Sequence, residues 1–147
     1  MIIHNSKRKG FSWDPEFKTA VQDLKIFLKT KEEGGDPTNL EIFMLCMAVG
    51  FDGGLKRDVP PRKTDSARLE VLTEREFAIM RALALHELKD SSKLLDDDVT
   101  FDIAEQYAAA GLMLLSQEMS ATKDFRGSLT ARLYKAVKSV RSSLDVS

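Results

Sequence analysis

The chain has 147 residues, a formal net charge of −1 and one cysteine. A chain of this length fits one ordinary domain and can bury roughly 70% of its unfolded surface, so it needs no disulfide or metal for stability. The near-neutral charge excludes a strong overall basic field, so nucleic-acid binding would require local patches or several copies. No apolar run reaches the ~18 residues of a membrane span, and the N-terminal residues lack the charge order of a signal peptide. These features predict a cytoplasmic protein that does not enter a membrane.

Residues 1–12 show no helical periodicity, and we expect them to form a flexible N-terminal arm. A single helical domain is predicted over residues 13–147. Its first helix should begin at Asp14, because an aspartate side chain can cap a helix and the following Pro15 suits the first turn. An apolar stripe then recurs at helical spacing through Phe17, Val21, Leu24 and Leu28.

The second predicted helix covers residues 38–50 and is apolar on all sides. A helix of this kind is buried at the centre of a protein or spans a membrane, and this one is about ten residues too short to span. We therefore expect it to form the centre of the fold and to end at Gly50, because glycine commonly terminates helices.

A long irregular stretch is predicted over residues 50–67, followed by a short extended segment over residues 68–72 that alternates apolar and polar residues. Thr73 and Glu76 form a capping box at the start of a third helix. The apolar stripe of that helix comprises Phe77, Met80, Ala84 and Leu88.

A fourth helix is predicted from Val99 to Met119, with a small residue, Gly111, on its apolar face, where another helix can approach closely. A fifth should run from Ser128 to Leu144. Its apolar face comprises Leu129, Leu133, Val137, Val140 and Leu144. The sequence thus predicts an all-α protein, a compact bundle of about five helices around the central helix 38–50.

No catalytic constellation is evident in the sequence. His86 and Glu87 begin a near miss to the H-E-x-x-H zinc motif, because the fifth position is Asp90. The acidic run Asp96–Asp98 is best explained as negative charge at a helix N-terminus, and Cys46 is best explained as a core residue. We therefore predict no enzyme activity, no cofactor and no metal site.

Two basic features could bind DNA phosphates. One lies in the irregular segment and comprises Lys56, Arg57, Arg62, Lys63 and Arg68; the other lies on the fifth helix and comprises Arg132, Lys135 and Lys138. Arginine can chelate phosphate, and an irregular backbone can follow a phosphate chain. For either patch taken alone, an ordinary solvated surface is the competing interpretation.

Two stretches resemble a known family. Leu45–Phe51, followed by Gly54, Lys56, Arg57, a proline at 60 or 61, Lys63, Arg68 and Glu70–Leu72, is similar to the DNA phosphorothioation-associated protein 4 family. Ile103–Leu112 is similar to an E-x-Y-A-x-x-G-L-like stretch of that family. The resemblance spans roughly residues 20–119, so the fifth helix is expected to be an addition. The helix order also resembles that of DndE, a small tetrameric protein of the same systems that binds nicked DNA.

The resemblance implies a bacterial setting of DNA phosphorothioation and antiviral defence. The leading hypothesis is a non-enzymatic accessory subunit that binds DNA phosphates as a homo-oligomer alongside other defence-system proteins. One rival is a protein-interaction module that docks on a larger ATPase or nuclease without touching DNA. A third alternative is an enzyme whose active site has no recognisable pattern.

Overall fold

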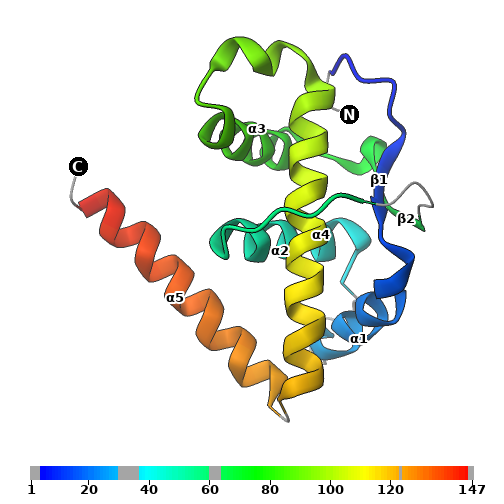
Figure 1. Cartoon of the computed structure of the whole chain (residues 1–147), viewed down its shortest axis with the longest axis vertical. Helices are drawn as coiled ribbons and strands as arrows, with labels where there is room; N and C mark the ends of the chain where they lie inside the picture. The colour runs from blue at the N-terminus through cyan, green and yellow to red at the C-terminus, as the bar shows by residue number, and fades with distance from the viewer. Residues whose placement is uncertain (1–3, 30–36, 60–63, 123, 146–147) are drawn as a thin grey trace.

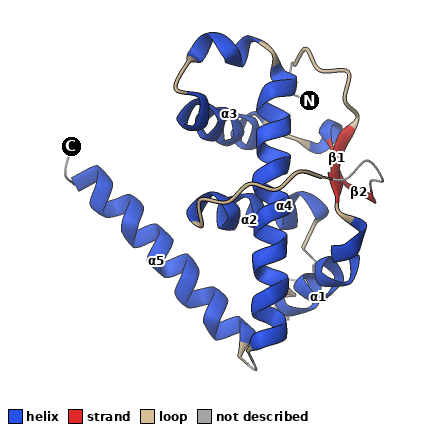
Figure 2. Cartoon of the chain, viewed as in Figure 1, coloured by secondary structure: helices blue, strands red, loops and turns tan. Residues whose placement is uncertain are grey.

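The computed structural model describes residues 4–29, 37–59, 64–122 and 124–145. Five α-helices, three short 3-10 helices and two strands occur within these ranges. In chain order they are β1 (Gly10–Trp13), η1 (Pro15–Phe17), α1 (Lys18–Leu28), α2 (Asn39–Asp52), β2 (Thr64–Arg68), η2 (Leu69–Val71), α3 (Glu74–Leu88), η3 (Ser91–Leu95), α4 (Asp97–Ala121) and α5 (Phe125–Asp145). The predicted all-α class is confirmed, with one small two-stranded sheet added (Figure 2).

The predicted starts of two helices, at Asp14 and at Thr73, are confirmed. Asp14 caps η1, which leads directly into α1, by accepting a hydrogen bond from the backbone N–H of Glu16. A capping box opens α2 at Thr38, and another opens α3 at Thr73. Each of these caps satisfies backbone donors that would otherwise lack a partner.

The long helix α4 forms the axis of the molecule, and α2 crosses it (Figure 1). The side chains that α2 buries most completely include Ile42, Phe43 and Cys46. A buried central helix over residues 38–50 is therefore confirmed, and it shares the centre with α4. Among the described residues, no helix is long and apolar enough to cross a membrane.

The sequence predicted that the central helix ends at Gly50, and this is wrong. Helix α2 continues to Asp52, and Gly53 caps it. Gly50 is instead buried where α2 crosses α4, and a Cβ at this position would overlap the carbonyl oxygen of Tyr107. Glycine can end a helix, or it can let two helices approach closely. Gly50 does the second. Gly111 serves the predicted close approach from the α4 side.

Residues 4–12, which we expected to form a flexible arm, contact the helical part of the protein in the structure. Residues 10–13 form β1, which pairs antiparallel with β2. Phe11 is 1% exposed and stacks on Phe43, with ring centroids 4.2 Å apart. The backbone N–H of Asn5 donates to Asp97 at 2.9 Å, and that of Ser12 donates to Glu105 at 3.0 Å. These contacts are all distant in sequence, so helical periodicity carries no sign of them.

The expected extended segment also differs from the structure. The strand lies earlier, at Thr64–Arg68, and Leu69–Val71 form a 3-10 turn that buries Leu69. The alternation over residues 68–72 therefore arises partly from a turn. A short alternation of apolar and polar residues does not distinguish a strand from a turn.

Helix α5 leaves the end of α4 and runs away from the other helices (Figure 1). It begins at Phe125, three residues earlier than predicted. Phe125 and Leu129 are buried, but Leu133, one turn further along the predicted stripe, is 40% exposed. The side chains of Val137, Val140 and Leu144 lie outside what the structure describes. Of the stripe residues whose side chains the structure describes, Leu129 is therefore covered and Leu133 is partly open.

Candidate nucleic-acid interface

Lys56 and Arg57 are positioned by the backbone that leaves α2. Gly54 adopts a φ of 66°, and the N–H of Arg57 donates to the carbonyl oxygen of Gln106 on α4 at 3.0 Å. The glycine allows a turn that other residues adopt at a cost. The segment is thereby held against α4, and the two basic side chains point to partners within the protein.

The guanidinium of Arg57 lies 3.1 Å from a carboxylate oxygen of Asp14 and 3.5 Å from one of Glu16. It also lies over the ring of Phe17, 4.8 Å from its centroid. Arg57 therefore joins the segment after α2 to the start of α1. The guanidinium already contacts two carboxylates and an aromatic ring, and this favours a structural role for Arg57.

Lys56 pairs with Glu87, which also accepts a hydrogen bond of 2.6 Å from the Tyr107 hydroxyl. The hydrogen bond from Lys56 and then that from Tyr107 hold the pKa of Glu87 below its usual range. Burial and the bond to Glu87 raise the pKa of Tyr107 to about 12. This cluster links α3, α4 and the segment after α2.

His86 and Glu87, which begin the sequence similar to a zinc motif, contact other side chains of the protein. Glu87 is engaged by Lys56 and Tyr107, and the ring of its neighbour His86 meets Phe51 edge-on at 5.2 Å. No group of three or more histidine, cysteine, aspartate or glutamate side chains suitable for a metal ion occurs in the described part of the chain. Cys46 is fully buried, and burial raises the pKa of its thiol, which leaves it without thiolate character.

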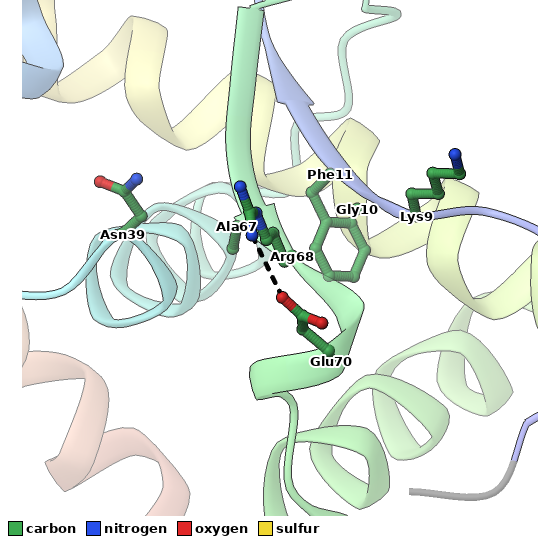
Figure 3. A pocket seen from close by; sticks show the side chains of 7 residues that line it. All are labelled: Lys9, Gly10, Phe11, Asn39, Ala67, Arg68 and Glu70. Atoms are coloured by element: carbon green, nitrogen blue, oxygen red, sulfur yellow. Dashed lines mark hydrogen bonds and ion pairs between the residues drawn. The ribbon is translucent and has the colours of Figure 1, made fainter. Parts of the chain in front are cut away.

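Arg68 lines a hollow of about 720 Å³ between the sheet and the start of α2 (Figure 3). Its guanidinium lies 3.3 Å from a carboxylate oxygen of Glu70 and is largely exposed. Lys9 and Asn39 line the same hollow. Lys9 was not among the predicted site residues, although the basic run Lys7–Lys9 could have indicated it. Two basic residues from distant segments of the chain, Lys9 and Arg68, therefore line this hollow.

Arg132 and Lys135 line a second hollow, of about 460 Å³, together with Asp52 of α2 and Glu118 of α4. Arg132 pairs with Glu118. Lys135 and Lys138 are exposed and have no ion-pair partner among the residues that the structure describes. Two of the three predicted cations of α5 are therefore not neutralised by a described carboxylate.

The structure does not bring the predicted basic residues into one patch. Lys56 and Arg57 are engaged at two different places, Arg68 lies beside the sheet, and the α5 cations flank the second hollow. Arg62 and Lys63 lie outside the described residues. Ion pairing of this kind could not be read from the sequence, because each partner comes from a distant segment.

The acidic run at the start of α4 behaves as the sequence predicted, as negative charge at a helix N-terminus. Asp96 caps the helix by accepting from the N–H of Asp98. The N-terminal segment then covers this acidic end, because Ser6 binds Asp98 and Arg8 binds Asp102. Two carboxylates of this acidic end, Asp98 and Asp102, are thus engaged by the N-terminal segment.

Fold and surface together describe a small helical protein whose described residues form no metal cluster, and in which four of the predicted basic residues, Lys56, Arg57, Arg68 and Arg132, pair with carboxylates. The sequence matches the family described as DNA sulphur modification system-associated protein 4 over residues 17–145. The chain belongs to this family. Because the match continues to residue 145, α5 is part of the family's sequence, and the expectation that it is an addition is wrong. No curated protein and no solved structure gives a significant match.

Proposed function

We propose that this protein is a non-enzymatic accessory subunit of a bacterial DNA sulphur modification and defence system, and that it contacts DNA phosphates as a homo-oligomer. Its family is associated with such a system by description. The observation that carries the DNA contact is the exposure of Lys135 and Lys138 on α5, with no carboxylate partner among the described residues. Phosphate neutralisation by lysine supplies sequence-independent affinity through counterion release.

The structure's charge pairing favours α5 over the segment after α2 as the place of contact. Lys56 and Arg57 would have to leave carboxylate partners before reaching a phosphate, whereas Lys135 and Lys138 would not. The hollow beside the sheet supplies a further place where Lys9 and Arg68 could hold a phosphate. Several copies would gather these separate cations into a larger basic surface.

A mobility-shift titration of duplex DNA at several salt concentrations tests this proposal. The charge-reversal pair Lys135→Glu and Lys138→Glu should weaken binding uniformly across sequences and reduce the salt slope by about two. The matched control is Lys18→Glu with Lys93→Glu, which makes the same net-charge change at exposed lysines elsewhere. Equal loss in the control would show that only net charge matters. Absence of binding at micromolar protein and low salt would overturn the proposal.

Arg62 and Lys63 remain predicted contacts. Their charge reversal offers a separate arm of the same titration, because they are far in sequence from α5. Loss of affinity there, with no change at Lys135 and Lys138, would move the contact to the segment between α2 and β2.

A protein-interaction module is the second candidate, and exposed apolar side chains favour it. Val71, Ile79 and Tyr134 are 52%, 46% and 71% exposed. Such a module would dock on a larger ATPase or nuclease of the same system through these side chains. Co-purification with a system component, combined with no shift of DNA at any salt concentration, would select this candidate over the first.

A further inference from the structure

The hollow of about 720 Å³ beside the sheet is built by three segments that are distant in sequence (Figure 3). Lys9 directly precedes β1, Asn39 begins α2, and Arg68 ends β2. The backbone N–H of Leu69 donates to the carbonyl oxygen of Lys9 at 3.0 Å, which holds the two basic residues on neighbouring segments. The fold therefore brings to one hollow two cations that no local sequence pattern joins.

Both cations of this hollow are accessible to an anionic ligand. Lys9 is exposed and has no ion-pair partner among the residues that the structure describes. Arg68 pairs with Glu70, but the two side chains are 80% and 62% exposed. Such an exposed pair contributes little to stability, and the guanidinium has further N–H donors for a ligand. Glu70 is the only carboxylate among the described residues that line the hollow, so two positive charges oppose one negative charge there.

A second hollow, of about 390 Å³, adjoins the first, because Asn39 and Arg68 line both. Its other described lining residues are Thr38, Leu40 and Val71, and Val71 is 52% exposed. Arg68 thus stands between a charged hollow and a largely aliphatic one. Ligand sites in proteins combine apolar walls with a few placed polar groups. The pair of hollows therefore suits a ligand with an anionic end and an apolar face.

The surroundings favour an anion at Arg68. Helix α2 begins at Asn39, and the N-terminus of a helix carries a partial positive charge. The carboxylates of Glu41 and Glu76 line a third hollow, together with Arg75, but neither lines a hollow that Arg68 lines. Each of the two accepts hydrogen bonds within the capping box of its own helix. Glu70 is therefore the carboxylate with which a bound anion would compete.

We propose that the two hollows together bind one nucleoside phosphate, with the phosphate between Lys9 and Arg68 and the base against Leu40 and Val71. Arginine binds phosphate through parallel N–H donors, and lysine adds a point charge. A phosphomonoester carries about −1.5 to −2 charges at pH 7, which two cations balance, whereas a phosphate inside a DNA strand carries a single charge. The choice of a nucleotide as the ligand rests on the DNA contact of the proposed function.

A free nucleotide and the phosphorylated end of a DNA strand present the same chemistry to this site. The site is separate from Lys135 and Lys138, since neither lysine lines these hollows. Failure of this inference is therefore distinguishable from failure of the proposed function. Binding of duplex DNA without any binding of nucleotide would remove only this inference. Binding of nucleotide without any binding of duplex would remove only the DNA contact through α5.

An NMR titration of the full, isotope-labelled chain with deoxyadenosine monophosphate tests the site. The amide signals of residues that line the two hollows should shift and reach saturation below millimolar nucleotide. Deoxyadenosine without the phosphate should bind at least about tenfold more weakly. The absence of saturable shifts at millimolar nucleotide, or shifts confined to α5, would overturn the site.

Single substitutions assign the two ends of the ligand. Arg68→Ala and Lys9→Gln should each weaken nucleotide binding by about tenfold, and Glu70→Gln should strengthen it by about threefold, because it removes the competing carboxylate. Val71→Ser should weaken binding of the nucleotide and leave binding of inorganic phosphate unchanged. The matched controls are Arg75→Ala and Lys93→Gln, at exposed residues that line neither hollow. Circular dichroism checks that every variant is folded. Equal losses in Arg68→Ala and Arg75→Ala would overturn the site.

Mobility shifts with two duplexes of one sequence identify the source of the nucleotide. One duplex carries phosphates at its ends and the other carries hydroxyl groups. If the end of a DNA strand is the ligand, the phosphorylated duplex binds more tightly, and Arg68→Ala removes this difference whereas Arg75→Ala preserves it. If the two duplexes bind alike while deoxyadenosine monophosphate saturates the site, the free nucleotide is the ligand.

Discussion

Gly50 of α2 and Gly111 of α4 lie at the same crossing, where each removes a side chain from the path of the other helix. A Cβ on Gly111 would overlap the carbonyl oxygen of Cys46, just as one on Gly50 would overlap that of Tyr107. The two helices meet backbone to backbone because both positions are glycine. This contact sets the geometry of the core, since α2 and α4 share its centre.

Gly111→Ala should destabilise the protein by about 3 kcal/mol or more, because the added methyl group meets backbone atoms that cannot move independently. The measurement is the free energy of unfolding from a urea titration. Gly53→Ala is the control, since its Cβ would lie 3.2 Å from the flexible Leu114 side chain, and we expect a change within about 1 kcal/mol. Equal effects at both positions would refute the close crossing.

Phe11→Ala should cost about 3 to 5 kcal/mol, as is usual for truncating a buried phenylalanine. Phe11 stacks on Phe43 and meets Phe101 edge-on at 5.7 Å. The same unfolding titration measures the loss. Leu95→Ala, at a side chain that is 79% exposed, should change stability by less than about 0.5 kcal/mol. A negligible effect at Phe11 would restore the interpretation of residues 1–12 as a loose arm.

Arg57→Gln should lower the free energy of unfolding by about 1 kcal/mol, because it removes the ion pairs with Asp14 and Glu16 from a partly exposed site. The affinity for DNA should stay unchanged once the variant is measured below its melting temperature. Thermal unfolding and mobility shift on one preparation check both statements. Weaker DNA binding with unchanged stability would instead make Arg57 a phosphate contact.

Glu87→Gln should cost up to about 1 kcal/mol at pH 7, because the amide can still accept from Tyr107 but no longer attracts Lys56 as an ion. The pKa of Glu87 is lowered in the folded protein, so its contribution is present above the pKa of the unfolded state. That contribution is lost as the pH falls through the folded-state value.

Urea titrations of wild type and Glu87→Gln at pH 7, 5 and 3 should therefore converge at the acidic end. Glu70→Gln serves as the reference for the loss of an exposed ion pair, because Glu70 pairs with the largely exposed Arg68. A difference between wild type and Glu87→Gln that persists unchanged at pH 3 would contradict an electrostatic role for Glu87.

Local signals in the sequence predicted much of the helical fold. The structure confirms the helix caps at Asp14 and Thr73 and the apolar stripes of α3 and α4. Each of these signals depends on residues within one or two helical turns. Strand β1 could not be found in this way. It exists because Gly10 and Trp13 pair with a segment more than fifty residues away, which helical periodicity does not encode.

The candidate site was less predictable for the same reason. A sequence shows that Lys56 and Arg57 are basic, but not that Glu87 and Asp14 lie beside them. Spacing likewise gives α5 an apolar stripe without saying whether the chain's own body covers it. Only the arrangement in space shows that Leu133 is left open and that Lys135 has no described carboxylate partner.

The burial of Cys46 at the helix crossing has a practical consequence. It is the only cysteine of the chain, and it is fully enclosed. A thiol-specific dye would therefore label a cysteine introduced on the surface and leave the native one untouched. Fluorophores attached at chosen surface positions, on α5 and on the body, could then report distances in solution without removing a residue from the core.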